Sequence, residues 1–212
     1  AIVFLIRQFT ESETLSMGRV LSVKEIRRIA DRHGEEPFCA RDKALISLAG
    51  MAYFSAAELS LLRVSDLITE RHGLMYDGYL PAELSASGHE RYFFIGKETY
   101  LLAALSEYIG WRIDQGFGVL DRDLYCGLNP DSRLFLKDDG TEFGLNFKSQ
   151  SGDRALTQAL QMQRHFKGFY LGEGVNLNVL QDSFIANFWQ IKSQEGTTQA
   201  IRDLIDMTGL TA

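Results

Sequence analysis

Residues 41–67, RDKALISLAGMAYFSAAELSLLRVSDL, decide the fold of this protein. Apolar residues recur there at helical spacing on both sides of a short interruption at residues 53–56. Ser55 is placed to cap a helix, because its hydroxyl can accept a hydrogen bond from an unpaired backbone N–H, and Glu58 completes a capping box. The stretch predicts a buried helix, a corner at Ser55 and a second helix that ends near Leu62. Taken alone, it predicts an αα-hairpin in a helical core.

The same stretch resembles the first motif of the tyrosine recombinases, the phage-integrase family, whose members typically read RDRALLLLLLYTGLRISELLALRVSDI. The two sequences align without a gap over residues 41–66, and the shared residues are Arg41, Asp42, Ala44, Leu45, Glu58, Leu59, Leu62, Arg63, Val64, Ser65 and Asp66. In the family, the residue at the corner is the first catalytic arginine, which holds the scissile phosphate. This sequence has Ser55 at that position.

Length and composition fit one soluble globular domain. The chain has 212 residues, of which 45% are hydrophobic and 24% are charged. We assign residues 1–20 to an N-terminal arm and residues 21–212 to an integrase/recombinase catalytic-like domain. The opening AIVFLI is too short to span a bilayer and lacks the basic start of a secretory signal, so we expect a cytoplasmic protein without membrane contact. The formal net charge of −6 argues against a strong general affinity for nucleic acid.

The sequence indicates no cofactor and no metal. Cys39 and Cys126 provide neither a disulfide framework nor a metal-ligand cluster. No GxSxG, HExxH or P-loop motif is present, although a new chemistry at spatially close residues stays open as an alternative. Residues 114–142 contain seven acidic side chains, which we interpret as a solvated acidic face. The alternative for that segment is a pair of carboxylates that bind a metal.

Residues 22–33 predict a helix before the deciding stretch. Ser22 and Glu25 form a second capping-box pattern, and Val23, Ile26 and Ile29 follow helical spacing. The segment resembles the LTPEEVRRLLDA helix with which recombinase catalytic domains begin. The family carries a helical DNA-clamping domain before this point, and the short stretch that precedes it here leads us to expect that this domain is absent.

Aromatic, glycine-bounded runs at residues 73–79 and 88–95 predict two short strands, followed by a helix at residues 100–113. The family places a small antiparallel sheet here, and its hairpin carries a catalytic lysine that acts as general acid for the leaving 5′-hydroxyl. About five positions before Arg91 the sequence has Ala86, and no lysine occurs between Lys43 and Lys97. The resemblance therefore implies that the catalytic lysine is missing.

The later catalytic positions are also replaced. Family members close the site with a box similar to HDLRHTFATHLL, whose counterpart is residues 178–186. Asn178 stands at the histidine position and Gln181 at the second phosphate-binding arginine, while Met207 takes the later His/Trp position in a predicted turn. The last tyrosine is Tyr170, too early for the nucleophile. We expect Ser55, Asn178 and Gln181 to surround one cleft, and we expect no recombinase chemistry.

The candidate DNA contacts lie on a helix predicted at residues 153–170 and on its flank. The family places the corresponding helix against DNA, and residues 143–174 carry four basic groups against two acids: Lys148, Arg154, Arg164 and Lys167. The alternative is an amphipathic surface helix with three apolar residues inward: Leu156, Leu160 and Phe166. We interpret His165 as a surface or half-buried side chain and not as a metal ligand, because no second ligand follows at helical spacing.

These observations predict a mainly α protein with a small antiparallel β-sheet (α+β), similar to the tyrosine-recombinase catalytic domain. The resemblance implies a catalytically inactive DNA-binding or accessory factor in DNA integration or recombination on a mobile element. Its expected partners are DNA, bound weakly, and an active integrase or a second copy of this chain. The alternative is a protein-interaction module that partners an active integrase without contacting DNA.

Overall fold

The computed structural model describes residues 19–33, 39–71, 73–96, 99–121, 123–143, 154–169, 171 and 174–209. Its helices are α2 (Val23–His33), α3 (Cys39–Met51), α4 (Ala56–Leu61), α5 (Val64–Leu67), α6 (Thr99–Asp114), α7 (Arg154–Gly168), α8 (Leu177–Lys192) and α9 (Thr197–Thr208). A short 3-10 helix, η1 (Tyr125–Gly127), follows α6, and the sheet consists of β1 (Asp77–Leu80) and β2 (Arg91–Phe94). The predicted architecture, mainly α with a small antiparallel sheet, is confirmed.

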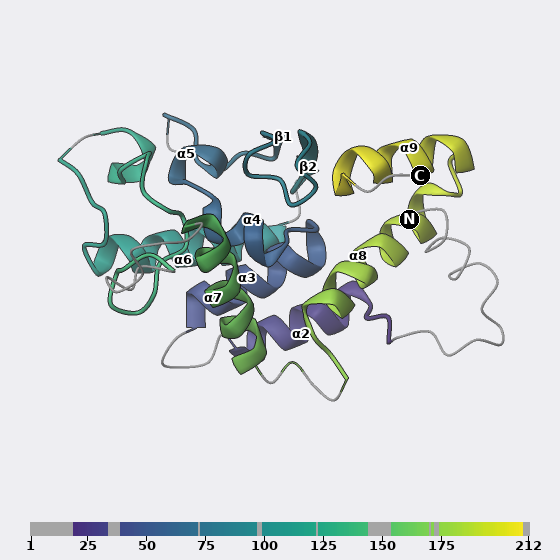
Figure 1. Ribbon diagram of the computed structural model, residues 1–212, viewed down its shortest axis with the longest axis horizontal. Helices are drawn as coiled ribbons and strands as arrows, with labels where there is room; N and C mark the ends of the chain where they lie inside the picture. Colours follow the sequence, from purple (N-terminus) through teal and green to yellow (C-terminus); the bar gives the residue numbers. More distant parts are fainter. Residues whose placement is uncertain are drawn as a thin grey trace.

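Helix α3 is the centre of the main core, and three other helices pack directly against it. It contacts α2, α6 and α8, and its residues 44–50 are buried on every side (Figure 1). A helix that is apolar all round belongs in a core, so the apolar run of the deciding stretch explains this position. Helix α2 begins as predicted, with the backbone N–H of Ser22 donating to Glu25 at 2.9 Å and that of Glu25 donating to the Ser22 hydroxyl at 3.3 Å.

The corner between α3 and α4 is built as the sequence predicts. The Ser55 hydroxyl accepts a hydrogen bond from the backbone N–H of Glu58, and the Glu58 carboxylate accepts one from the backbone N–H of Ser55. Tyr53 turns the chain with a φ of 58°, a left-handed conformation that disfavours side chains with a Cβ. The recombinase motif quoted above has glycine at this position, so the backbone bend is kept although the residue that favours it is not.

Helix α7 packs on α4 through a different face from the predicted one. Phe166 is buried as predicted, but Leu160 is 45% exposed. The other buried residues of this face are Met162, one turn before Phe166, and Gln158, two turns before it. The Gln158 amide is tolerated there because its nitrogen donates to Glu142 at 3.2 Å. The predicted inward position of Leu160 is therefore wrong, and the Leu156 side chain lies outside the described part of the structure.

The two strands form an antiparallel hairpin with Asp77 opposite Phe94 and Tyr79 opposite Tyr92. Residues of one face, among them Leu80 and Phe93, are buried, while the opposite face is more exposed. Residues 133–136 resemble a family strand in sequence. Among the described residues this segment makes isolated bridges, from Arg133 and from Leu136, and no continuous ladder.

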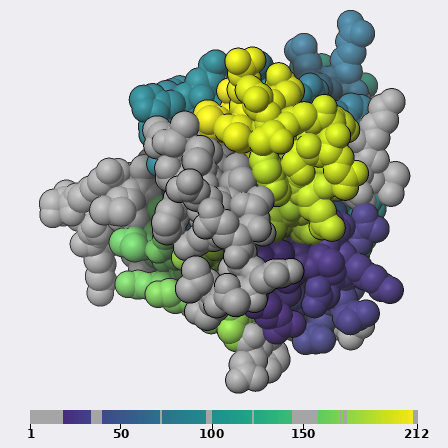
Figure 2. All heavy atoms as spheres, turned by 90° about the vertical axis from the view of Figure 1, so that its right-hand side faces the viewer, coloured from purple at the N-terminus to yellow at the C-terminus, as the bar shows by residue number. Residues whose placement is uncertain are grey.

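Helices α8 and α9 enclose a second, smaller core. It contains the buried residues Phe184, Ile185, Leu204 and Met207, and α9 also packs against β2. Figure 2 shows α8 and α9 in yellow tones, with the teal hairpin region beside them and purple α2 on the other side. The predicted turn at residues 204–207 lies inside α9, which continues to Gly209, a C-cap residue with a φ of 66°. No helix in the described ranges is long and apolar enough to cross a membrane.

Candidate functional site

A buried ion pair between Glu58 and Arg91 lies at the corner where the first catalytic residue was predicted. Arg91 Nε lies 2.7 Å from Glu58 Oε1 and Arg91 Nη2 lies 2.9 Å from Oε2, which is the bidentate geometry of a guanidinium on a carboxylate. Both residues are 2% exposed. The pair therefore joins α4 to β2 in the interior of the protein.

Three of the positions that the motif resemblance aligns with catalytic residues are hydrogen-bonded to this pair. The backbone N–H of Ser55 donates to Glu58 at 2.8 Å, and the backbone N–H of Ala86 donates to the same carboxylate at 3.2 Å. Arg91 Nη1 donates to the backbone carbonyl of Met207 at 2.6 Å. Residues from three distant parts of the sequence thus meet at one point, namely Ser55, Ala86 and Met207.

Arg91 does not offer its guanidinium to a phosphate. Besides Glu58 and Met207, it donates from Nη2 to the carbonyl of Tyr53 at 3.2 Å and from Nη1 to that of Tyr92 at 3.4 Å. The guanidinium also lies 5.1 Å from the ring centre of Phe54. Every nitrogen of the fork has a protein acceptor, so Arg91 holds the scaffold together and has no donor left to bind a phosphate.

The other two positions that the resemblance aligns with catalytic residues, Asn178 and Gln181, lie on α8. Gln181 is half-buried, one turn before Phe184, whose ring packs against Tyr53 with 5.8 Å between centroids. Burial, together with the charge of Asp182, raises the pKa of Tyr53 to about 12, so this phenol is neutral at physiological pH. Asn178 lines a groove of about 410 Å³ together with Lys167. That groove lies between the ends of α7 and α8 and includes none of Ser55, Ala86 and Met207.

The predicted basic contacts are described only in part. Lys148 lies outside the described residues, and Arg154 is the first residue of α7 with its side chain outside them. Arg164 and Lys167 are exposed on α7. His165 between them is half-buried, as predicted, and its Nε2 lies 2.9 Å from Asp42 Oδ1. The last two predicted contacts are thus placed at the surface, where an anion can reach them.

A second basic surface lies on α2, where the sequence analysis did not place one. Residues 19–33 carry five basic groups against two acidic ones. Four of them are exposed, and we call the three that lie on the helix, Lys24, Arg28 and Arg32, the α2 basic stripe. Their spacing of four residues puts them about 6 Å apart along one side of the helix. They line a groove of about 530 Å³ together with Arg27 and Asp31. Charge counting along residues 19–33 would have revealed this stripe.

The acidic segment at residues 114–142 is used for ion pairs. Asp138 lies 2.5 Å from Arg41, which is buried beside Asp42, and Asp131 lies 3.7 Å from Arg63 at the surface. Within the described ranges, no three His, Cys, Asp or Glu side chains are grouped to hold a metal ion.

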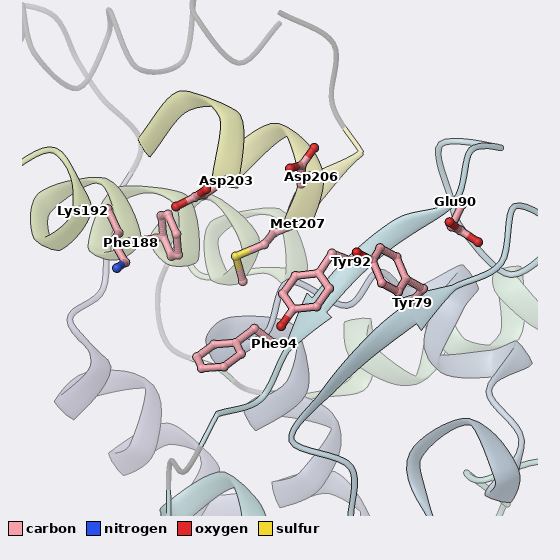
Figure 3. Close-up of a pocket in the computed structure, with 9 residues that line it drawn as sticks. All are labelled: Tyr79, Glu90, Tyr92, Phe94, Phe188, Lys192, Asp203, Asp206 and Met207. Carbon is pink, nitrogen blue, oxygen red and sulfur yellow. The ribbon is translucent and has the colours of Figure 1, made fainter. Parts of the chain in front are cut away.

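A further groove, of about 560 Å³, lies beside Met207, between the exposed face of the hairpin and helices α8 and α9 (Figure 3). We call it the acidic aromatic groove, and its lining residues are Tyr79, Glu90, Tyr92, Phe94, Phe188, Lys192, Asp203, Asp206 and Met207. Among the residues that the structure describes, it carries three carboxylates against one lysine. Because like charges repel, it is not suited to binding a phosphate.

Comparison with known proteins identifies the fold. No protein-family model and no curated protein matches this sequence. Among solved structures, the crystal structure of XerA recombinase is similar, with a TM-score of 0.57 and 18% sequence identity. The match covers 93% of this chain and 58% of the XerA chain, so this chain spans little more than half of the XerA length. Together with the helical core and the two-stranded sheet, this likeness shows that the chain has a tyrosine-recombinase-like fold.

Proposed function

We propose that this protein is a recombinase-like, non-catalytic DNA-binding or accessory factor in DNA integration or recombination on a mobile element. The observation that carries the proposal is the arrangement around Glu58 and Arg91. Backbone groups of Ser55, Ala86 and Met207 hydrogen-bond to this pair, and the side chains at these three positions are neutral. The likeness to XerA recombinase supports the same class of function.

The neutral side chains are the reason for proposing a non-catalytic role. Transfer of a phosphoryl group to tyrosine builds charge on the non-bridging oxygens, and guanidinium groups in bidentate geometry stabilise that charge. Ser55 and Gln181 carry no charge, and Ala86 has no proton to give to a leaving oxygen. Because these groups act as a unit, we expect the loss of several to lower the rate by orders of magnitude.

DNA binding in this proposal uses the two basic surfaces on α7 and α2. Arg164 and Lys167 are exposed on α7, and the α2 basic stripe is exposed on its own helix. The two helices meet at their C-terminal ends, where the ring of His33 lies 5.1 Å from that of Phe169. A duplex that follows this junction would contact both surfaces with its phosphates. The overall charge of −6 opposes binding, so we expect micromolar or weaker affinity at physiological salt.

Fluorescence anisotropy of a labelled duplex tests this proposal. Arg164→Glu with Lys167→Glu, and separately Lys24→Glu with Arg28→Glu, should each weaken binding more than tenfold, because each removes two cations and adds two anions. The matched control is Arg71→Glu with Arg202→Glu, two exposed arginines outside α2 and α7. If the control weakens DNA binding equally, the loss of affinity reflects the change in net charge and not the position of the basic residues. Absence of binding by the wild type at low salt would refute the proposal.

The second candidate function is a protein-interaction module that partners an active integrase without contacting DNA. The observation that favours it is the acidic aromatic groove, which presents exposed aromatic rings where a phosphate would be repelled. If the wild-type protein binds an integrase but no DNA, this second function is supported in place of the first.

A further inference from the structure

The outer face of the hairpin is aromatic instead of polar. Tyr79 and Tyr92 lie directly opposite each other with ring centroids 5.3 Å apart, and Phe94 follows on the same face. Tyr79 is 66% exposed and Phe94 is 49% exposed. The exposed face of an antiparallel sheet is usually polar, so a set of open rings on it indicates a surface that is covered in some state of the protein.

Helices α8 and α9 add apolar side chains to this face and complete the acidic aromatic groove. Figure 3 shows Met207 of α9 pointing toward the rings of Tyr92 and Phe94, with Phe188 of α8 at its other side. Ile191, next to the groove residue Lys192 in sequence, is 63% exposed. The surface is therefore concave and built from separate elements, which fits a segment that inserts and not a flat contact.

The charges of the groove are unbalanced. Glu90, Asp203 and Asp206 line it, and the only cation that lines it within the described residues is Lys192. Lys192 already lies 2.7 Å from Glu195, and Asp203 accepts a hydrogen bond from Gln199 at 2.6 Å. In the part of the chain that the structure describes, Glu90 and Asp206 form no ion pair. The rim of the groove is thus negative and offers carboxylates to a cation.

We propose that the acidic aromatic groove binds a basic, amphipathic peptide segment of a partner protein. Arginine or lysine side chains of the segment pair with Glu90 and Asp206 and lie over the rings of Tyr79 and Phe94 by cation–π attraction. Its apolar residues cover Phe188 and Met207. Rings and carboxylates in one groove match this chemistry, whereas DNA matches neither because its phosphates are repelled. The groove is separate from the basic surfaces on α2 and α7, so this inference does not depend on DNA binding.

The test uses a fluorescein-labelled peptide in which arginine alternates with leucine, and a matched peptide with glutamate in place of arginine. Anisotropy should show that the wild type binds the arginine peptide, with weakening as salt rises, and does not bind the glutamate peptide. Asp203→Asn with Asp206→Asn should weaken binding about tenfold, and Tyr79→Ala should weaken it similarly. Tyr79 is an exposed side chain, so its removal leaves the fold intact, which circular dichroism checks.

The control for net charge is Asp114→Asn with Asp121→Asn, because both residues are exposed outside the groove and the charge change is the same. This variant should bind the arginine peptide as the wild type does. Equal weakening in the control, or equal binding of the two peptides, would overturn the inference. Duplex DNA binding, measured on the same samples, should be unchanged by Asp203→Asn with Asp206→Asn. If the wild type does not bind the arginine peptide while it still binds duplex DNA, the groove inference is refuted and the proposed function stands.

Discussion

The guanidinium of Arg91 donates two parallel hydrogen bonds, of 2.7 and 2.9 Å, to the carboxylate of Glu58. Both residues are only 2% exposed to solvent. The pair joins the helix after the corner to the second strand, and Arg91 also binds the carbonyl of Met207 on α9. Three elements therefore depend on one buried charge pair.

Removal of one partner should destabilise the whole domain. Glu58→Gln leaves the guanidinium buried without its counter-charge, and we expect the free energy of unfolding to fall by about 3–5 kcal/mol. Urea denaturation followed by circular dichroism measures this. Asp131→Asn is the control, because its partner Arg63 lies 3.7 Å away and both side chains are exposed, so the loss should stay under about 1 kcal/mol. Similar losses in both variants would contradict the assigned role of the buried pair.

The capping box at the corner predicts a smaller effect. Ser55→Ala removes the hydroxyl that accepts from Glu58 N–H, and we expect a loss of about 1 kcal/mol in unfolding free energy. Ser55→Thr keeps the acceptor and should lie within a few tenths of the wild type by the same denaturation measurement. An unchanged stability of Ser55→Ala would mean that the cap is not needed once α4 is packed.

A contact could be predicted from the sequence when its two residues lie close together along the chain. Ser55 and Glu58 are three residues apart, and their pattern alone predicted the capping box. Glu58 and Arg91 are 33 residues apart, and nothing in the spacing indicates that they pair. The inward face of α7 was assigned to Leu160 because it is apolar, whereas Gln158 is buried because Glu142 and the packing against α4 satisfy it. Tertiary contacts decided both outcomes.

The candidate site was predictable to a similar extent. Motif alignment singles out Ser55, Ala86 and Met207, and the structure joins backbone groups of all three to one ion pair. It did not reveal that Asn178 lines a different groove, shared with Lys167. The charges of the α2 basic stripe are visible in the sequence, but the family resemblance favours the helix at residues 153–170 as the DNA contact.

Stability should depend on pH through Asp42. Burial alone would raise the pKa of this carboxyl, but the hydrogen bond with His165 and the charge of Arg41 outweigh it and hold the pKa below its ordinary value of 3.8. A lowered pKa means that the carboxylate stabilises the folded state above about pH 4 and loses this effect as the pH falls through the folded pKa. Urea midpoints between about pH 5 and pH 3 should drop less for Asp42→Asn than for the wild type. Parallel curves would show that Asp42 is not responsible.

Catalytic activity should be absent. Purified protein incubated with nicked duplex substrates should give no covalent protein–DNA adduct on a denaturing gel, with an active recombinase on its own site as positive control. Ser55→Arg should also give none, because catalytic groups that act together are not restored one at a time. A phosphotyrosyl adduct on the wild-type chain would show that the motif positions are assigned wrongly.

The salt dependence of DNA affinity tests the central claim most directly, namely that a recombinase scaffold without its catalytic charges still binds DNA through basic side chains. Each phosphate contact contributes about −0.9 to the slope of log K against log salt. The four contacts on α7 and its flank, Lys148, Arg154, Arg164 and Lys167, give a slope of about −3.6, and the three residues of the α2 basic stripe bring it to about −6. We predict a slope in this range for the wild type, with a decrease of about 2 in magnitude for Lys24→Glu with Arg28→Glu. A slope near zero, or no binding at low salt, would contradict the account.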